Sequence, residues 1–191
     1  MSNLVTLECA CGTVKGKLNV VAGSFFHVQC LCCDCQNFAS NLSNENVILD
    51  KHGATDLLQT YPAYLQISEG KDNLACLQLE EKGIYRWHTT CCSMPVANTM
   101  SSPKIPFVGV SVTLMKFANE QEKLEVLGPI TLKAFAKYSI GEMPDEAYSK
   151  FPITFMPRVL SFMLKGAFRK LNRPSPFFSD DKPIVEAKVL S

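Results

Sequence analysis

The residues of this chain that are best suited to chemistry are its nine cysteines, eight of which fall into three short clusters. The clusters read Cys-x-Cys, Cys-x-Cys-Cys-x-Cys, and an adjacent pair. Thiolates spaced in this way can turn toward one metal ion, whereas a disulfide requires Cα atoms roughly 4.4–6.8 Å apart at suitable angles. We therefore expect metal binding rather than a disulfide framework.

The first cluster, Cys9-Ala10-Cys11-Gly12, offers two thiolates from one tight turn. Gly12 would let the backbone fold closely around an ion, because glycine adopts conformations that other residues avoid. Two ligands do not complete the tetrahedron of a structural zinc site, so this pair needs a partner cluster elsewhere in the chain.

His88 and Cys91 are the expected partners, because two intervening residues give the spacing of a zinc knuckle. A histidine in this place could instead be a core residue hydrogen-bonded to the backbone. Cys92 could replace Cys91 as the ligand, although we favour Cys92 as a small buried side chain. The expected ligands of a closed, structural zinc are Cys9, Cys11, His88 and Cys91.

The second cluster, residues 30–35, holds four thiols in six residues. Cys30, Cys32 and Cys35 can bind one ion from a single loop and leave its fourth coordination position open, as catalytic zinc sites do. A closed site that also uses Cys33 is the alternative, but ligation by two adjacent residues is awkward. We expect two zinc ions per chain, one structural and one a candidate catalytic ion, although thiolate-rich sites also suit iron.

Short strands and turns are predicted for residues 1–115, and helices for residues 130–172. The predicted helical part includes a helix start at Pro144 and a longer helix from Arg158 to Leu171, which ends before Pro174. We therefore divide the chain into a zinc-binding domain of residues 1–128 and a helical extension of residues 129–191 packed on it. The predicted strands include residues 4–7, 13–18, 25–28, 64–67, 74–79, 83–88 and 107–115.

Composition narrows the class of protein. Hydrophobic residues make up 47% of the 191-residue chain, and the formal net charge is +1, so no overall field points to nucleic acid or membrane. The N-terminus does not resemble a signal peptide, and no apolar run reaches the ~18 residues of a membrane-spanning helix. We expect a cytoplasmic location, no transmembrane segment and no nucleic-acid partner.

The order of these three motifs resembles the glutathione-dependent formaldehyde-activating enzyme family, to which centromere protein V also belongs. The resemblance covers roughly residues 4–115. It implies a mainly β fold, a zinc-bearing β-tent of antiparallel strands, here with the helical C-terminal extension. Two features depart from the family pattern: His88 stands where the family has a cysteine, and Cys92 where it has a glycine.

The resemblance also implies an activity, that of a zinc-dependent carbon–sulfur lyase similar to S-hydroxymethylglutathione synthase. Its substrate would be an adduct of formaldehyde, or another aldehyde, with glutathione or another small thiol. The structural role would fall to the outer motifs and the catalytic role to Cys30, Cys32 and Cys35. A non-catalytic zinc-stapled interaction domain and a thiol redox sensor are the alternatives. The candidate proton donors are Asp34, His52, Tyr61 and Tyr64.

Between Glu146 and Asp180 the chain has no acidic residue but several lysines and arginines, with apolar residues at helical spacing. The simplest interpretation is a helix packed on the sheet with a solvated basic face. Alternatives are a cationic wall for an anionic substrate and contact with anionic lipid or a partner. Phenylalanines in this segment would also suit the interface of a homo-oligomer.

Overall fold

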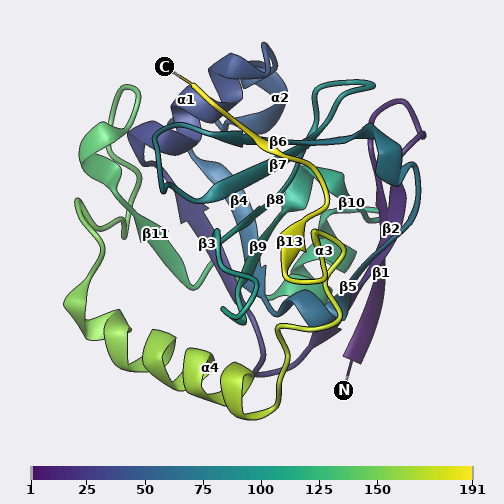
Figure 1. Ribbon diagram of the computed structural model, residues 1–191. Helices are drawn as coiled ribbons and strands as arrows, with labels where there is room; N and C mark the ends of the chain where they lie inside the picture. The colour runs from purple at the N-terminus through teal and green to yellow at the C-terminus, as the bar shows by residue number, and fades with distance from the viewer. Residues whose placement is uncertain (1, 191) are drawn as a thin grey trace.

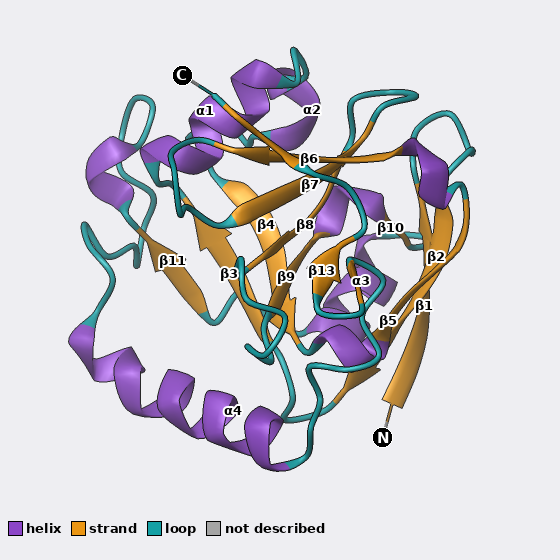
Figure 2. Ribbon diagram, viewed as in Figure 1, coloured by secondary structure: helices purple, strands orange, loops and turns teal. Residues whose placement is uncertain are grey.

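The computed structural model describes residues 2–190, which form a mainly β protein with two packed sheets and a few helices (Figures 1 and 2). The first sheet is antiparallel and has the strand order β10-β1-β2-β5. Its strands are β1 (Ser2–Glu8), β2 (Lys15–Val21), β5 (Leu65–Glu69) and β10 (Met115–Lys116).

The second sheet is mixed and has the order β11-β3-β4-β9-β8-β7-β6-β14. Its six inner strands run antiparallel to one another, and each edge strand is parallel to its neighbour. The inner strands are β3 (Phe26–Cys30), β4 (Thr55–Thr60), β9 (Val108–Ser111), β8 (Pro95–Thr99), β7 (Tyr85–Thr89) and β6 (Leu74–Gln78). The edge strands are β11 (Leu132–Ala134) and β14 (Ala187–Val189), so the chain after residue 128 completes both edges of this sheet.

The helices lie around the sheets. They are α1 (Cys33–Asn41), α2 (Glu45–Ile48), α3 (Glu120–Leu127) and α4 (Met156–Phe168), and a small hairpin joins β12 (Phe178–Ser179) to β13 (Lys182–Pro183). Figure 1 shows α1 and α2 at one end of the second sheet and α4 at the other. None of the helices within residues 2–190 has the length and apolar character needed to cross a membrane.

The main core lies between the two sheets because each strand turns alternate side chains toward it. Leu7 and Leu18 enter it from the first sheet, and Leu58 and Val110 from the second. Trp87, the only tryptophan, is fully buried there and donates a hydrogen bond from its indole nitrogen to Thr99 Oγ1 at 3.0 Å.

Residues 177–189, near the C-terminal end of the chain, complete this core. Phe177 is fully buried, and its ring stacks on that of Trp87 with centroids 4.7 Å apart. Immediately beyond the hairpin, β14 pairs with β6 in parallel register, for example Ala187 with Cys76. The last segment is therefore part of the core and of the main sheet.

Three expectations about helices were wrong. Residues 132–134, within the part predicted to be helical, form the edge strand β11. Residues 144–147 form a turn instead of starting a helix, and Glu146 has a left-handed φ of 57°, which a helix does not allow. Conversely, residues 33–41, within the part read as strands and turns, form α1. Cys32 caps this helix by accepting a hydrogen bond from the Cys35 N–H, a capping role that Ser or Thr usually fills.

Candidate metal centres

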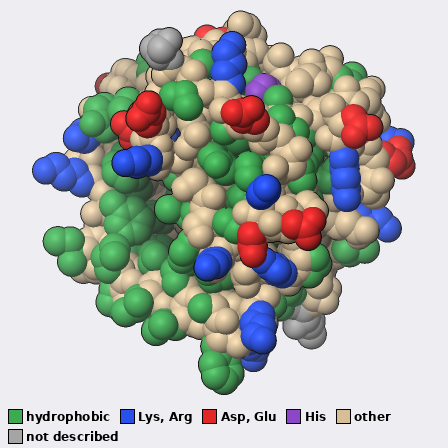
Figure 3. Space-filling model, in the orientation of Figure 1, with side chains coloured by type: hydrophobic (Ala, Val, Ile, Leu, Met, Phe, Trp, Pro, Cys, Tyr) green, Lys and Arg blue, Asp and Glu red, His purple; other side chains and the backbone are tan. Residues whose placement is uncertain are grey.

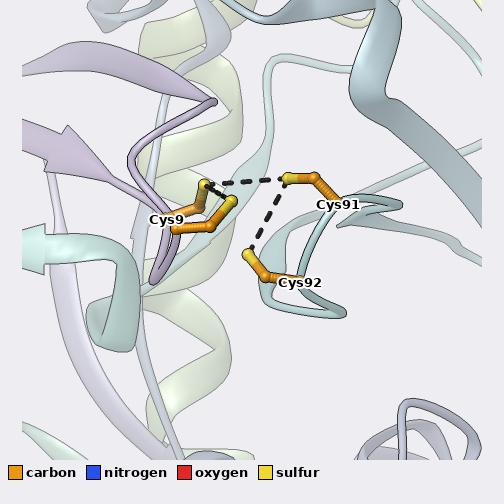
Figure 4. A group of neighbouring side chains, drawn as sticks. Cys9, Cys91 and Cys92 are labelled. Carbon is orange, nitrogen blue, oxygen red and sulfur yellow. Dashed lines mark hydrogen bonds between the residues drawn. The ribbon is translucent and has the colours of Figure 1, made fainter.

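Four cysteines from two distant turns meet at one end of the sheets. Cys9 follows β1 and Cys11 lies in the β1–β2 turn, while Cys91 and Cys92 lie in the turn between β7 and β8. Their sulfur atoms all lie within 4.8 Å of one another. Figure 4 shows Cys91 and Cys92 reaching toward Cys9 from the opposite turn.

The sulfur–sulfur distances match a tetrahedral metal site. They are 3.5 Å for Cys9–Cys11, 3.9 Å for Cys9–Cys91 and 3.8 Å for Cys91–Cys92. A metal–sulfur distance of ~2.3 Å places the sulfurs of a tetrahedron about 3.8 Å apart. This group of cysteines could therefore hold a metal ion.

Local structure in the first turn arranges two of these sulfurs. Gly12 has a φ of +77°, and its N–H donates to the Cys9 carbonyl, which folds the turn tightly. The Val14 N–H donates to Cys9 Sγ at 3.2 Å. Hydrogen bonds with the side chain and backbone of Thr13 lower the pKa of Cys11 to about 6, which favours the thiolate that a metal requires.

The structure departs from the sequence-based ligand set at one position, because Cys92 joins this group and His88 does not. Neighbouring residues on a strand face opposite sides of the sheet. Since Trp87 points into the main core, His88 points to the other side, where its ring contacts Phe38 of α1 at 6.2 Å between centroids. Burial lowers the pKa of His88 and favours its neutral form.

The second group consists of Cys30, Cys32 and Cys35, whose sulfurs also lie within 4.8 Å of one another. Cys30 ends β3, Cys32 caps α1, and Cys35 lies buried in the first turn of that helix. The fully buried side chain of Leu31 points into the protein. The side chains of its two neighbours, Cys30 and Cys32, therefore both point to the opposite side. Their sulfurs are 3.4 Å apart.

Cys33 stays outside this group. It lies exposed on α1, and its thiol contacts the Asp34 carboxylate at 3.7 Å. The structure thus brings together the three cysteines expected from the sequence, without the fourth thiol of the loop.

A buried arginine that the sequence interpretation missed stands behind the three cysteines. Arg86 of β7 is 2% exposed, and its guanidinium lies 3.9 Å from Cys35 Sγ, 3.6 Å from Asp34 Oδ2 and 5.6 Å from the centre of the Phe38 ring. A charged residue inside the apolar strand Tyr85-Arg86-Trp87 was the signal that could have revealed it, because arginine is seldom fully buried without a partner.

These surroundings favour a thiolate at Cys35. Hydrogen bonds from Cys30 and Cys32, supported by the charge of Arg86, hold the pKa of Cys35 well below its usual value although burial opposes the shift. Hydrogen bonds with Cys32 and Cys35, together with burial, raise the pKa of Cys30. The N-terminal end of α1 adds partial positive charge beside Cys32.

Behind the three cysteines lies a cavity of about 10 Å³, which Cys35, Arg86, Thr55, Asn98 and other residues line. This volume suits one water molecule. Thr55 Oγ1 and Asn98 Oδ1 are buried and make no hydrogen bond with the other described residues. The wall behind the group is thus mostly apolar, with Phe38, Leu57 and Pro95 in it, and carries these few polar groups and the Arg86 cation.

The candidate proton donors lie in different places. Asp34 is exposed and adjoins the three-cysteine group through Arg86. His52 bonds to the carbonyl of Glu142 in an exposed loop. Tyr61 is buried and donates its hydroxyl to the backbone of α4, and Tyr64 contacts the Tyr61 ring. Asp34 is the candidate for which the structure shows a link to the group.

Comparisons with known proteins give a family and distant structural similarities. The sequence model of a family of unknown function (DUF6151) matches residues 1–188. A crystal structure of a Rhodobacter sphaeroides protein is similar with a TM-score of 0.46 and 18% identity, over 65% of this chain and 96% of that one. No curated protein matches.

Proposed function

The chain belongs to the family of unknown function DUF6151, and we propose that it is a zinc-dependent carbon–sulfur lyase acting on an adduct of an aldehyde with glutathione or another small thiol. The observation that carries this proposal is the group of Cys30, Cys32 and Cys35 beside the buried Arg86. Three thiolates leave one of four zinc positions for a substrate thiol. The resemblance of the three cysteine motifs to the formaldehyde-activating family supports the same chemistry.

The two cysteine groups would have different roles. The four-cysteine group would hold a closed structural zinc, and the three-cysteine group an open one. Zinc bound by the latter would supply the positive charge that favours ionisation of an incoming thiol. The chain itself contributes Arg86, whose buried guanidinium holds Cys35 in place and offsets the negative charge of the sulfurs.

The reaction requires one proton to leave and one to arrive. When an adduct R–S–CH2–OH breaks down, the carbon–sulfur bond breaks, the hydroxyl loses its proton as the aldehyde forms, and the sulfur leaves as a thiolate that is then protonated. We assign the proton transfer to the Asp34 carboxylate, because it adjoins Arg86 and its side chain is open to solvent. The reverse reaction adds the thiol to the aldehyde by the same steps. Free thiols of this kind suit a reducing compartment such as the cytoplasm.

The test compares two neighbouring cysteines. Cys32→Ser removes one sulfur of the group and keeps a residue that caps helices well, whereas Cys33→Ser changes an exposed thiol outside the group. We expect elemental analysis to give two zinc ions for the wild type and for Cys33→Ser, and one for Cys32→Ser. Calorimetry should detect glutathione binding only where the second ion is present, with S-methylglutathione as the control that lacks a thiol.

Catalytic activity is then measured by NMR, as the rate at which formaldehyde and glutathione exchange with their adduct. An enzyme should accelerate this exchange in the wild type and in Cys33→Ser, while Cys32→Ser should fall to the uncatalysed rate. Two zinc ions with no thiol binding and no acceleration would contradict the lyase proposal.

A second candidate function, a zinc-stapled interaction domain without catalysis, is favoured by the size of the cavity at Cys35. Its volume of about 10 Å³ is far too small for a tripeptide thiol, so a substrate would have to approach from the solvent side of α1. If glutathione does not bind, the metal ions serve the fold alone, and this second function is preferred.

A further inference from the structure

The packing of α4 fixes which side of this helix faces outward. The Phe162 ring stacks on Tyr61 at 4.2 Å between centroids, and the Tyr61 hydroxyl donates to the Phe162 carbonyl at 2.8 Å. Gly166 lies so close that an added Cβ would come within 2.5 Å of the Tyr61 ring. Since Phe155 is buried on the same side, the opposite side of α4 must face away from the protein.

That outward side is apolar along the whole helix. Met156, Leu160, Leu164 and Phe168 follow one another at intervals of four residues, which places them in one stripe. Leu160, Leu164 and Phe168 are 60%, 61% and 91% exposed, and Ile153 just before the helix is 85% exposed. In Figure 3 hydrophobic side chains gather along the lower left margin, over the region that α4 occupies in Figure 1. We call these five residues the α4 stripe.

The charged residues of α4 and of the segments on either side of it, residues 147–179, are all basic. Arg158, Arg169 and Lys170 are exposed at its flanks, and Lys165 is held by hydrogen bonds to the Gly23 carbonyl and Ser24 Oγ. The sequence from residue 147 to residue 179 contains no aspartate or glutamate. A partner that covers the stripe therefore lies against lysines and arginines that have no acidic neighbour within this segment.

We propose that the α4 stripe docks on the surface of a membrane containing anionic lipid. A helix that combines an apolar face with flanking lysines and arginines can lie in the membrane interface, with its apolar side chains among the acyl chains and its cations at the headgroups. The 13-residue helix is roughly 20 Å long and lies at the margin of the molecule, where a flat surface can reach it (Figure 1).

Charge argues for lipid over a second copy of this chain. Two copies meeting symmetrically through α4 would bring their arginines and lysines together without acidic partners, which is unfavourable. An anionic lipid surface supplies the missing negative charge and accepts the apolar side chains at the same time.

The test is sedimentation of the full chain with vesicles, either of phosphatidylcholine alone or of phosphatidylcholine and phosphatidylserine in equal amounts. We expect binding to the anionic vesicles, weaker binding at high salt, and little binding to neutral vesicles. The double variant Leu164→Ser/Phe168→Ser should bind at least about tenfold more weakly, because it removes two exposed apolar side chains. The variant Arg169→Gln/Lys170→Gln should lose the preference for anionic lipid.

The matched control is Leu124→Ser, which removes a half-exposed leucine from α3 and should leave vesicle binding unchanged. Emission from the buried Trp87 reports whether each variant keeps its fold. The variant Phe168→Trp adds a second fluorophore in the stripe, and its emission should shift to the blue when anionic vesicles are added.

Three results would overturn the proposal. The first is no sedimentation with either vesicle, and the second is equal sedimentation of the wild type and the Leu164→Ser/Phe168→Ser variant. The third is a wild-type dimer in light scattering that becomes monomeric in this variant while vesicles do not bind, since a second copy would then cover the stripe.

Discussion

At the scale of single residues, the two cysteine groups differ in how their sulfurs are surrounded. Cys35 is buried against the guanidinium of Arg86, whereas Cys11 and Cys91 of the four-cysteine group are exposed. The first arrangement excludes water from part of the site, and the second leaves these two sulfurs at the rim of two turns, although Cys9 is buried. An ion at the rim can stabilise the fold without needing access for a substrate.

The fourth metal ligand of the four-cysteine group, Cys92 or His88, can be tested directly. Cys92→Ser should remove about one zinc per chain, because Cys92 Sγ lies 3.8 Å from Cys91 Sγ. His88→Gln should keep its zinc, because this side chain faces Phe38 on the other side of the sheet. Elemental analysis of the two purified variants measures both. Loss of zinc in His88→Gln together with full retention in Cys92→Ser would restore the sequence-based ligand set.

The sequence predicted most of the grouping of the cysteines because neighbouring ligands in one turn or loop are close in the sequence. The grouping of Cys30, Cys32 and Cys35 follows from one loop, and Gly12 indicates the tight turn. The choice between His88 and Cys92 depends on which face of β7 meets the first turn, and on a register shift between Trp87 and His88. Arg86 was missed because its partners, Asp34 and Cys35, lie about fifty residues away in the sequence.

At the scale of elements, the antiparallel pairing of β2 with β5 depends on a glycine. A Cβ added at Gly16 would lie 2.2 Å from the Gln66 carbonyl oxygen, a backbone atom that cannot move aside. We expect Gly16→Ala to lower the free energy of unfolding by about 2–4 kcal/mol, at the upper end of the cost of overpacking.

The control for this prediction is Gly109→Ala, in another inner strand. Its Cβ would have no neighbour closer than 3.8 Å, so the variant should change stability by less than about 1 kcal/mol. Urea unfolding followed by Trp87 fluorescence measures both variants. Equal stability of the two would mean that β2 and β5 can separate without cost.

A charged contact ties β4 to its neighbours and makes stability depend on pH. Asp56 accepts hydrogen bonds from His27 Nε2 of β3 at 2.8 Å and Lys123 Nζ of α3 at 3.0 Å. Although burial opposes it, these partners lower the pKa of Asp56 below 3.8. The ionised carboxylate therefore stabilises the folded state fully above pH 3.8, and this contribution is lost as the pH falls through the lower, folded-state pKa.

Asp56→Asn should accordingly cost about 1.5–3 kcal/mol near neutral pH, the range for hydrogen bonds to a charged group. The difference from the wild type should shrink as the pH falls below 3.8. Urea unfolding of both proteins across this range measures it. A difference that stays constant with pH would show that the carboxylate charge contributes nothing.

Elements were predicted best where the hydrophobic alternation is clear. The strands at residues 4–7, 74–79 and 83–88 correspond to β1, β6 and β7. The edge strands β11 and β14 are three residues long, too short for a periodic pattern, and they form because a parallel neighbour offers free backbone groups. The longer helix predicted at Arg158–Leu171 corresponds to α4, with its start two residues earlier.

At the scale of the whole molecule, the four-cysteine group links the two sheets. Cys9 and Cys11 belong to the turn of the first sheet, and Cys91 and Cys92 to a turn of the second. An ion there would close a long loop between them and contribute to the free energy of folding. The three-cysteine group only joins β3 to the helix that follows it.

Removing metal should therefore destabilise the protein mainly through the four-cysteine group. We expect a chelator to lower the unfolding temperature of the wild type, and Cys11→Ser to reproduce most of that change. Cys32→Ser should reproduce a smaller part, because its link is local. Thermal unfolding followed by circular dichroism, with zinc content measured on the same samples, tests the order. A larger effect of Cys32→Ser would reverse these roles.

The stacking of Phe177 on Trp87, together with the pairing of β14 with β6, has a consequence for synthesis on the ribosome. Residues 74–99 can form a hairpin-rich sheet early, but its edge stays open and Trp87 stays unstacked until residues 177–189 have left the exit tunnel. During that interval the nascent chain exposes an unpaired strand and an incomplete core, so it should depend on chaperones that bind such surfaces.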